Sequence, residues 1–190
     1  MIKGAEASIE IEEDKVIKRR EPKEYRHPKL DSKIRKERTE TEARLIEDAR
    51  RHNVSAPEAE IIDESTIELE KLEGKQLKED LDGRIELMEK LGKNIAYLHS
   101  TGIIHGDLTT SNVMISEEEL YIIDFGLSFR SQRTEDKAVD IHLLKQVLNS
   151  SHPEITEKAW KNFIEGYGKY EESEEVLEQL EDVEKRGRYK

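Results

Sequence analysis

The stretch IIHGDLTTSNVMI, residues 103–115, places two polar side chains, Asp107 and Asn112, in a short loop between two apolar runs. The apolar runs are rich in β-branched residues, so they predict short buried strands that hold the loop in place. Further along, the stretch IIDFG puts Asp124 directly after another apolar run. Carboxylate and amide oxygens are ligands that Mg²⁺ prefers, so the pattern predicts a magnesium site between buried strands.

Two motifs in this region fit a site for phosphoryl transfer. HGDLTTSN matches the H-x-D-L-x-x-x-N pattern of a kinase catalytic loop, and Asp-Phe-Gly follows it in the expected order at 124–126. Either motif alone occurs by chance in turns, whereas both together, with apolar flanks, are specific. Phosphoryl transfer needs positioned Mg²⁺ and an anionic group at the acceptor hydroxyl. We therefore expect Asp107 to act as the catalytic base, and Asn112 and Asp124 to hold Mg²⁺ beside ATP.

A lysine and a glutamate upstream would complete such a site. Val16-Ile17-Lys18 is similar to the V-A-I-K pattern whose lysine contacts the phosphates. On a following helix we expect Glu42 to pair with Lys18, ahead of Glu40 and Glu37, because Glu42 precedes the apolar side of that helix. The alternative is that Lys18 is one more member of a basic run over residues 18–38. The remaining candidate ATP-binding residues are Gly4, Ala5, Glu6, Ala7, Glu70 and Leu72.

The chain departs from the usual protein kinase pattern in three respects. KGAEASIEI holds one glycine, Gly4, where a phosphate-covering loop reads G-x-G-x-x-G, and Glu6 would repel phosphate. Thr109 stands where protein kinases usually place a lysine, and neither an A-P-E motif nor a long activation segment follows Asp124. These departures predict a modest phosphotransferase, or one that needs a partner to complete its site. Asp140 either supports the catalytic loop from beneath or serves the dipole of its own helix.

Apolar spacing divides the chain into a strand-rich first third and a helical remainder. Alternation predicts hairpins over 7–20 and 59–74, and helical spacing predicts helices over 35–52 and 85–98, the second ending near Gly102. Short strands are expected at 112–116 and 120–125. Three further stripes predict core-facing helical residues: Val139, Leu143, Leu144 and Val147; Trp160, Phe163, Ile164 and Tyr167; and Val176, Leu177, Leu180 and Val183.

These elements predict an α+β fold of the minimal bilobal protein-kinase-like kind. We expect a small β-rich N-lobe with one helix over residues 1–73. A reduced helical C-lobe over 74–190 would carry the catalytic loop, the Asp-Phe-Gly triplet and a basic C-terminal tail, without an activation segment. The elbow between the lobes falls near Gly74.

Composition limits the function classes further. The formal net charge is −12, 40% of the residues are charged, and the sequence contains no cysteine. Disulfides and thiolate metal sites are therefore excluded. No apolar run approaches the about 18 residues of a membrane-spanning helix, so we expect a soluble, cytoplasmic protein with no membrane partner. Basic islands at 18–38 and in the last residues could touch phosphates or an acidic partner, or could be solvated helix faces.

At these motifs the sequence resembles the PRPK family of small atypical kinases, the kinase subunit of the KEOPS complex in archaea and eukaryotes. The similar stretches are KGAEA at 3–7, VIKRREPKEYRHPKLD at 16–31, HGDLTTSN at 105–112, IDFGLSF at 123–129, EDKAVD at 135–140 and RGR at 186–188.

The resemblance implies more than the residues alone. Such proteins bind ATP and Mg²⁺, autophosphorylate on Ser/Thr, and associate with the catalytic subunit that makes threonylcarbamoyl adenosine at position 37 of tRNA, together with further small KEOPS subunits. In that setting they act more as an ATPase switch than as a protein kinase. The resemblance implies that the basic tail contacts tRNA or a partner through Lys185, Arg186, Arg188 and Lys190. Gly4 lies close to Met1, which is consistent with a stand-alone subunit or with a piece of a fusion.

Two other functions compete with this one. A small-molecule phosphotransferase of the aminoglycoside or choline kinase type uses a similar loop, but needs a larger helical subdomain than the residues after Asp124 can build. A non-catalytic module that keeps nucleotide as a structural ligand is favoured by the single glycine and by Thr109. The intact set of Lys18, Asp107, Asn112 and Asp124 opposes it. The sequence does not identify the phosphoacceptor.

Overall fold

The computed structural model describes residues 2–3 and 7–187. The first third forms an antiparallel sheet with strand order β1-β2-β3-β5-β4. Its strands are β1 (Ile2–Lys3), β2 (Ser8–Ile11), β3 (Lys15–Arg19), β4 (Ala59–Asp63) and β5 (Thr66–Glu70). Both predicted hairpins are present, as the pairs β2–β3 and β4–β5. The central pairing joins β3 to β5 and sets Lys18 opposite Ile67, so the candidate lysine is on an interior strand.

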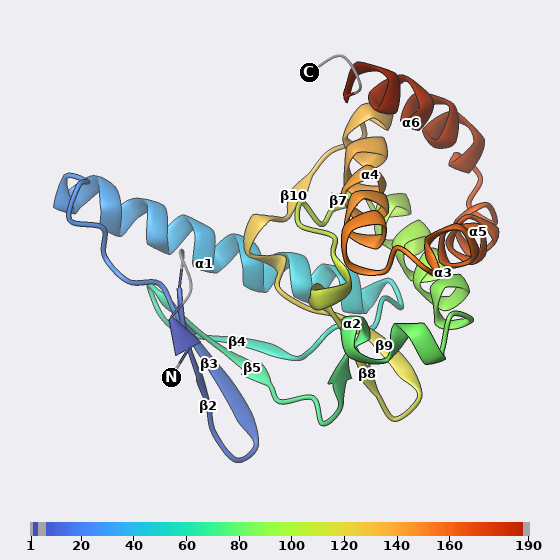
Figure 1. Cartoon of the computed structure of the whole chain (residues 1–190). Coiled ribbons are helices and arrows are strands. Elements are labelled where there is room, and N and C mark those ends of the chain that lie inside the picture. The colour runs from blue at the N-terminus through green and yellow to red at the C-terminus, as the bar shows by residue number, and fades with distance from the viewer. Residues whose placement is uncertain (1, 4–6, 188–190) are drawn as a thin grey trace.

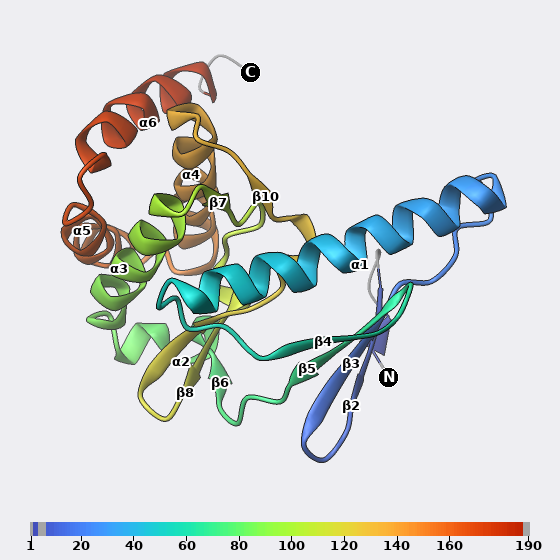
Figure 2. The same cartoon turned by 180° about the vertical axis from the view of Figure 1, so that it is seen from behind.

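One long helix, α1 (Pro28–Arg51), packs beside this sheet. Figures 1 and 2 show its N-terminal part projecting past the sheet. The helix begins before the predicted range of 35–52 because Pro28 at its first turn favours a helix start. The added turns carry few buried apolar side chains, so periodicity could not reveal them. The buried apolar residues of α1 lie in its second half: Ala43, Leu45, Ile46 and Ala49.

The rest of the chain is mainly helical and surrounds two small sheets. Its helices are α2 (Leu77–Asp80), α3 (Leu87–Ser100), α4 (Thr134–Ser151), α5 (Thr156–Tyr167) and α6 (Ser173–Gly187). Its strands are β6 (Lys75–Gln76), β7 (Ile103–Ile104), β8 (Val113–Ser116), β9 (Glu119–Ile122) and β10 (Phe129–Arg130). Short 3₁₀ turns are η1 (Leu81–Gly83), η2 (Thr110–Asn112) and η3 (Phe125–Leu127). Strands β6, β8 and β9 form one sheet, and β7 pairs with β10. This arrangement is the predicted α+β, two-part architecture.

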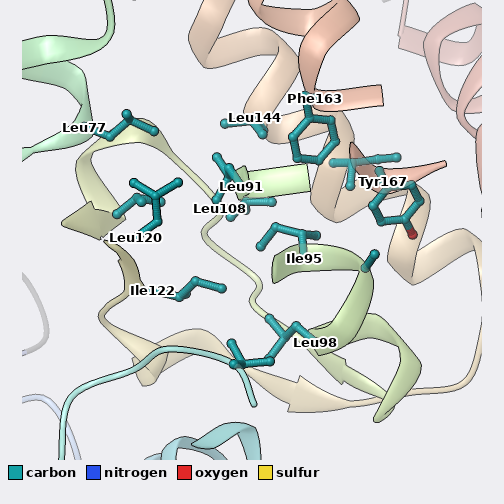
Figure 3. Packing of buried hydrophobic residues seen from close by; sticks show 14 of the residues in the cluster. Leu77, Leu91, Ile95, Leu98, Leu108, Leu120, Ile122, Leu144, Phe163 and Tyr167 are labelled. Atoms are coloured by element: carbon teal, nitrogen blue, oxygen red, sulfur yellow. The ribbon is translucent and has the colours of Figure 1, made fainter. Parts of the chain in front are cut away.

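Helices α3 and α5 pack with their backbones in contact. A Cβ atom built on Gly92 of α3 would lie 2.1 Å from the carbonyl oxygen of Phe163, and one on Gly166 of α5 would lie 2.0 Å from that of Glu89. Because neither position has room for a side chain, the apolar residues of α3 reach the aromatic side chains of α5. Figure 3 shows this part of the core. Fully burying one large apolar side chain contributes about 1.5–3 kcal/mol, so this contact stabilises the packing of α3 against α5.

The inward face of α4 differs from the predicted stripe. Val139 is 49% exposed, and Leu143 and Val147 are only half-buried. The buried apolar residues of the helix are Ala138, Ile141, Leu144 and Leu148. The helix is rotated in this way because Asp140 points at the catalytic loop, which turns Val139 outward. The stripes predicted for α5 and α6 do face the core, through Phe163, Tyr167, Val176 and Leu180 among others.

The two parts are joined by the segment between β5 and β6. We propose a domain boundary between residues 73 and 74, within that segment. None of the helices in the described part of the chain is long and apolar enough to cross a membrane.

Candidate active site

Lys18 on β3 is held between two carboxylates. Its Nζ lies 2.7 Å from Oε1 of Glu42 on α1 and 2.7 Å from Oδ1 of Asp124. The predicted pairing of Lys18 with Glu42, rather than with Glu40 or Glu37, is therefore present. Burial alone would lower the pKa of Lys18, but the charges of Glu42 and Asp124 outweigh it, so this pKa is raised and the amine stays cationic.

A second cation, Arg20, contacts the same glutamate. Its Nη2 lies 2.5 Å from Oε2 of Glu42, and its Nη1 donates to Oγ1 of Thr39 at 3.3 Å. Arg20 was not predicted from the sequence, where it is one member of the basic run. The available signal was the strand period of two, which, continued one residue past the end of β3, places Arg20 on the same side of the chain as Lys18.

Asp124 occupies a strained position two residues after the end of β9. Its backbone lies in the left-handed region, with φ 61° and ψ 68°. Burial raises the pKa of the Asp124 carboxyl, but Lys18 and the amide of Gly126 outweigh this and lower it. Both of these partners bond Oδ1, at 2.7 Å and 3.3 Å, so Oδ2 has coordination capacity for a cation.

Gly126 leaves the space in which these charges meet. A Cβ atom there would lie 3.0 Å from Oδ1 of Asp124, 3.1 Å from Nζ of Lys18 and 3.8 Å from Nη2 of Arg20. A side chain at this position would intrude among the charged atoms. The glycine of the Asp-Phe-Gly triplet therefore has a direct packing reason here.

The catalytic loop brings Asp107 and Asn112 together. Nδ2 of Asn112 donates to the carbonyl oxygen of Asp107 at 2.8 Å and to its Oδ2 at 3.0 Å. These bonds fix the amide so that its oxygen, the atom a metal would use, is left for a ligand. The amide of Asp107 in turn donates to Nδ1 of His105 at 3.3 Å. The loop thus holds its own two functional side chains.

Asp140 supports this loop from α4. Its carboxylate accepts from the amides of His105 and Gly106 at 2.9 and 2.8 Å, and Nε2 of His99 lies 3.1 Å away. Nδ1 of His99 is 2.9 Å from the hydroxyl of Tyr167. Burial raises the pKa of the Asp140 carboxyl, but His99 and the loop outweigh this and lower it. Of the two readings that the sequence left open, the structure favours loop support.

A cavity of about 360 Å³ adjoins these groups, a size within the range of small-molecule sites. Lys18, Asn112 and Asp124 line it, together with apolar residues including Val16 and Leu69. The predicted ATP-binding residues Glu70 and Leu72 line it too, whereas Asp107 contacts it through Asn112. Glu42 lies behind Lys18, and Ala7 is buried just before β2. Gly4, Ala5 and Glu6 lie outside the described residues.

The predicted tail residues are only partly described. Lys185 and Arg186 lie near the end of α6, where they pair with Asp182 at 3.2 Å and Glu135 at 2.8 Å. Figure 1 shows α6 at the opposite end of the molecule from the β1–β5 sheet. Arg188 and Lys190 lie outside the described residues.

The donor set fits a magnesium ion that is shared with a nucleotide. Within the described residues there is no group of three or more His, Asp or Glu side chains that could hold a metal alone. Mg²⁺ beside ATP commonly takes one or two protein oxygens and completes its shell with phosphate and water. The side-chain oxygen of Asn112 suits that role because the amide nitrogen beside it is already bonded to Asp107. Oδ2 of Asp124 suits it because Oδ1 is already bonded to Lys18.

Comparison with known proteins identifies the family of this chain. A model described as the protein kinase domain matches residues 23–159. A probable serine/threonine-protein kinase BUD32 homolog of Archaeoglobus fulgidus is 39% identical, over 98% of this chain and 94% of that protein. The KEOPS complex subunit Bud32 of Pyrococcus abyssi is 36% identical over the same shares. The chain belongs to the Bud32 family of protein kinases. This confirms the family that the sequence motifs predicted.

Other members of this kinase family are parts of longer proteins. The probable bifunctional tRNA threonylcarbamoyladenosine biosynthesis protein of Methanosarcina acetivorans is 43% identical over 98% of this chain, and the chain spans 35% of that protein's length. The solved complex of WaaP with acyl carrier protein superimposes with TM-score 0.60 at 15% identity, covering 96% of this chain and 88% of the other. An amicoumacin kinase bound to AMP-PNP and Ca²⁺ gives 0.59 at 14%, covering 88% and 73%. These two show the kinase-like fold alone.

Proposed function

We propose that this chain is an atypical Mg·ATP-dependent Ser/Thr kinase or ATPase. In this proposal it acts in the cytoplasm as a regulatory subunit of a KEOPS complex that makes threonylcarbamoyladenosine at tRNA position 37. The observation that carries the chemistry is that Lys18, Asn112 and Asp124 line one cavity, with Asp107 bonded to Asn112. The family relatives named for tRNA threonylcarbamoyladenosine synthesis and for the KEOPS complex support the cellular role.

The cavity divides into a part for the base and a part for the phosphates. Its apolar lining residues and the segment from Glu70 to Leu72 would take the adenine end of ATP. Lys18 would neutralise the phosphates, and Asn112 and Asp124 would hold Mg²⁺. Bound Mg·ATP supplies the transferable phosphoryl group and a cation that offsets the charge developing on it.

Asp107 is the proposed catalytic residue of the acceptor side. Its carboxylate is half-buried and fixed by Asn112, so it can orient an attacking hydroxyl or water and take up its proton. Thr109, near this position, brings no positive charge toward the phosphates. We therefore expect slow turnover by the isolated chain and faster turnover in the presence of the threonylcarbamoyl-transferring subunit.

The partner proposal includes that catalytic subunit, further small KEOPS subunits and, through the complex, tRNA. Lys185 and Arg186 support a contact with tRNA phosphates, because both are exposed and each pairs with an acidic side chain at the surface. Surface ion pairs of this kind contribute only about 0–1 kcal/mol, so they could be replaced by phosphate contacts.

One variant tests the metal assignment. Asp124→Ala should abolish Mg·ATP turnover while circular dichroism and the melting temperature show a folded protein. Glu119→Ala removes an exposed carboxylate at the start of β9 and should turn over ATP as the wild type does. Wild-type turnover by Asp124→Ala would overturn the assignment.

Thr109 also favours a second candidate, a module that binds nucleotide without turning it over. Phosphate release, measured with and without the catalytic subunit, separates the two functions. Release that rises on addition of the partner supports the first proposal. Tight binding of Mg·ATP with no release in either condition supports the second.

A further inference from the structure

Four charged side chains form one compact cluster behind the cavity: Lys18, Arg20, Glu42 and Asp124. Oε1 of Glu42 bonds Lys18 at 2.7 Å, and Oε2 bonds Arg20 at 2.5 Å. Lys18 also bonds Asp124 at 2.7 Å. The cluster therefore contains two cations and two anions, and each oxygen of Glu42 has its own cation.

The four members differ in their access to a ligand. Lys18 and Asp124 line the cavity. Glu42 and Arg20 are held deeper, with side-chain exposures of 1% and 5%. Arg20 is fixed further by Oγ1 of Thr39, itself buried on α1. A ligand can thus reach the Lys18–Asp124 pair, while the Arg20–Glu42 pair stays enclosed.

A bound nucleotide would change the charge balance of the Lys18–Asp124 pair. If Asp124 binds a cation and Lys18 turns its charge to the phosphates, the bond between them is lost and the hold of Lys18 on Glu42 weakens. A buried carboxylate that loses its only counter-ion is strongly destabilised, whereas one that keeps a second counter-ion is not. With Arg20 in place, the cluster can give up part of the Lys18 contact without leaving Glu42 uncompensated.

We propose that Arg20 is a positioning residue that keeps Glu42 neutralised, so that the charge of Lys18 is available to the phosphates of a bound nucleotide. Arg20 does not touch the nucleotide in this proposal. It acts through Glu42 and also ties α1 to the residue that follows β3, which keeps the helix in place in a chain whose sequence lacks a long activation segment. The inference rests on the proposed nucleotide-binding function and extends it to a residue outside the cavity.

The test compares two ligands that share a base but differ in phosphate. Dissociation constants for adenosine and for AMP-PNP with Mg²⁺ are measured by calorimetry on the full chain. Arg20→Met should bind adenosine within about twofold of the wild type and Mg·AMP-PNP at least about tenfold more weakly, because Glu42 then captures Lys18. Arg19→Met is the matched control: it removes the neighbouring arginine, which is exposed at the end of β3, and should leave both constants unchanged.

A purely structural role for Arg20 predicts a different pattern. Loss of folded protein would raise the apparent dissociation constants of both ligands by the same factor, and that outcome would overturn the proposal. Unchanged binding of Mg·AMP-PNP by Arg20→Met would do so as well. Arg20→Lys, which keeps the charge, should recover part of the lost affinity.

A double variant keeps the test decisive if Arg20→Met does not fold. Arg20→Met combined with Glu42→Gln removes both inner charges and leaves the Lys18–Asp124 pair balanced. The double variant should fold and bind Mg·AMP-PNP more tightly than Arg20→Met does. If Arg20→Met is unfolded, the double variant should bind Mg·AMP-PNP within about tenfold of the wild type. Weaker binding would refute the role of Arg20. A wild type that binds adenosine and Mg·AMP-PNP equally would refute the proposed function itself, which is a separate outcome.

Discussion

Replacing Asp140 by alanine should destabilise the protein by about 2–6 kcal/mol. The carboxylate is 2% exposed and pairs with the amides of His105 and Gly106 and with His99. The His105 amide and His99 are buried, and each costs about 1–3 kcal/mol when left without a partner, whereas the exposed Gly106 can bond water instead. Since a domain of this kind is stable by only about 5–15 kcal/mol, the loss is a large share of the total.

Urea unfolding at neutral pH, followed by circular dichroism, measures this change as a shift of the midpoint at constant slope. Asp136→Ala is the matched control, because it removes a carboxylate from the first turn of α4 that is 24% exposed and accepts from Ser131. We expect the control to cost about 1 kcal/mol. A carboxylate that served only the helix dipole would contribute about 0.3–1 kcal/mol, and only within the first turn. A loss below about 1 kcal/mol for Asp140→Ala would therefore refute loop support.

Four further outcomes follow from the structure. Because the pKa of Asp140 is lowered on folding, the native state binds fewer protons than the unfolded state. The free energy of unfolding of the wild type should therefore exceed that of Asp140→Asn by the full amount above about pH 5, and by less as the pH falls below about 3.8. Urea unfolding of both proteins over this pH range measures the difference. Phe163→Ala should cost about 3–5 kcal/mol in urea unfolding, since its ring is fully buried and stacks on Tyr167 at 5.8 Å; an effect below about 1 kcal/mol would contradict this packing. Tyr167→Phe should cost about 1 kcal/mol, through loss of the hydroxyl contact with His99; an unchanged urea midpoint would show that this contact contributes nothing. Gly126→Ala should weaken Mg·ATP binding about tenfold in calorimetry while changing stability by less than about 1 kcal/mol, and unchanged affinity would mean that the charged atoms can move aside.

The elements whose pattern depends on burial were predictable from the sequence. Both hairpins of the first sheet and the helix carrying Leu91 and Ile95 were predicted from apolar spacing alone. The pairing of Lys18 with Glu42 was also predicted, from the Val-Ile-Lys motif and from the place of Glu42 beside the apolar side of its helix. In each case a local repeat reports on which side of an element is enclosed.

Other features depended on contacts that no local repeat encodes. The first turns of α1 carry few apolar residues, so its start at Pro28 was missed. In α4 two sets of apolar residues satisfy helical spacing, and only the bond between Asp140 and the distant loop decides that Val139 faces outward. Arg20 was not predicted because it lies within a charged run, although its spacing of two from Lys18 would have placed it on the same side of the chain.

The left-handed backbone of Asp124 lowers the stability of this kinase at a residue that the proposed metal site uses. A non-glycine residue in that conformation costs about 1–3 kcal/mol, which glycine would avoid entirely and asparagine would reduce. Directed evolution of this chain for heat resistance alone would therefore favour exchanges at a position that the proposed metal site requires. A thermostable library of this kinase should be screened for nucleotide binding alongside melting temperature, or the selected variants will be well-folded proteins that lack the proposed metal site.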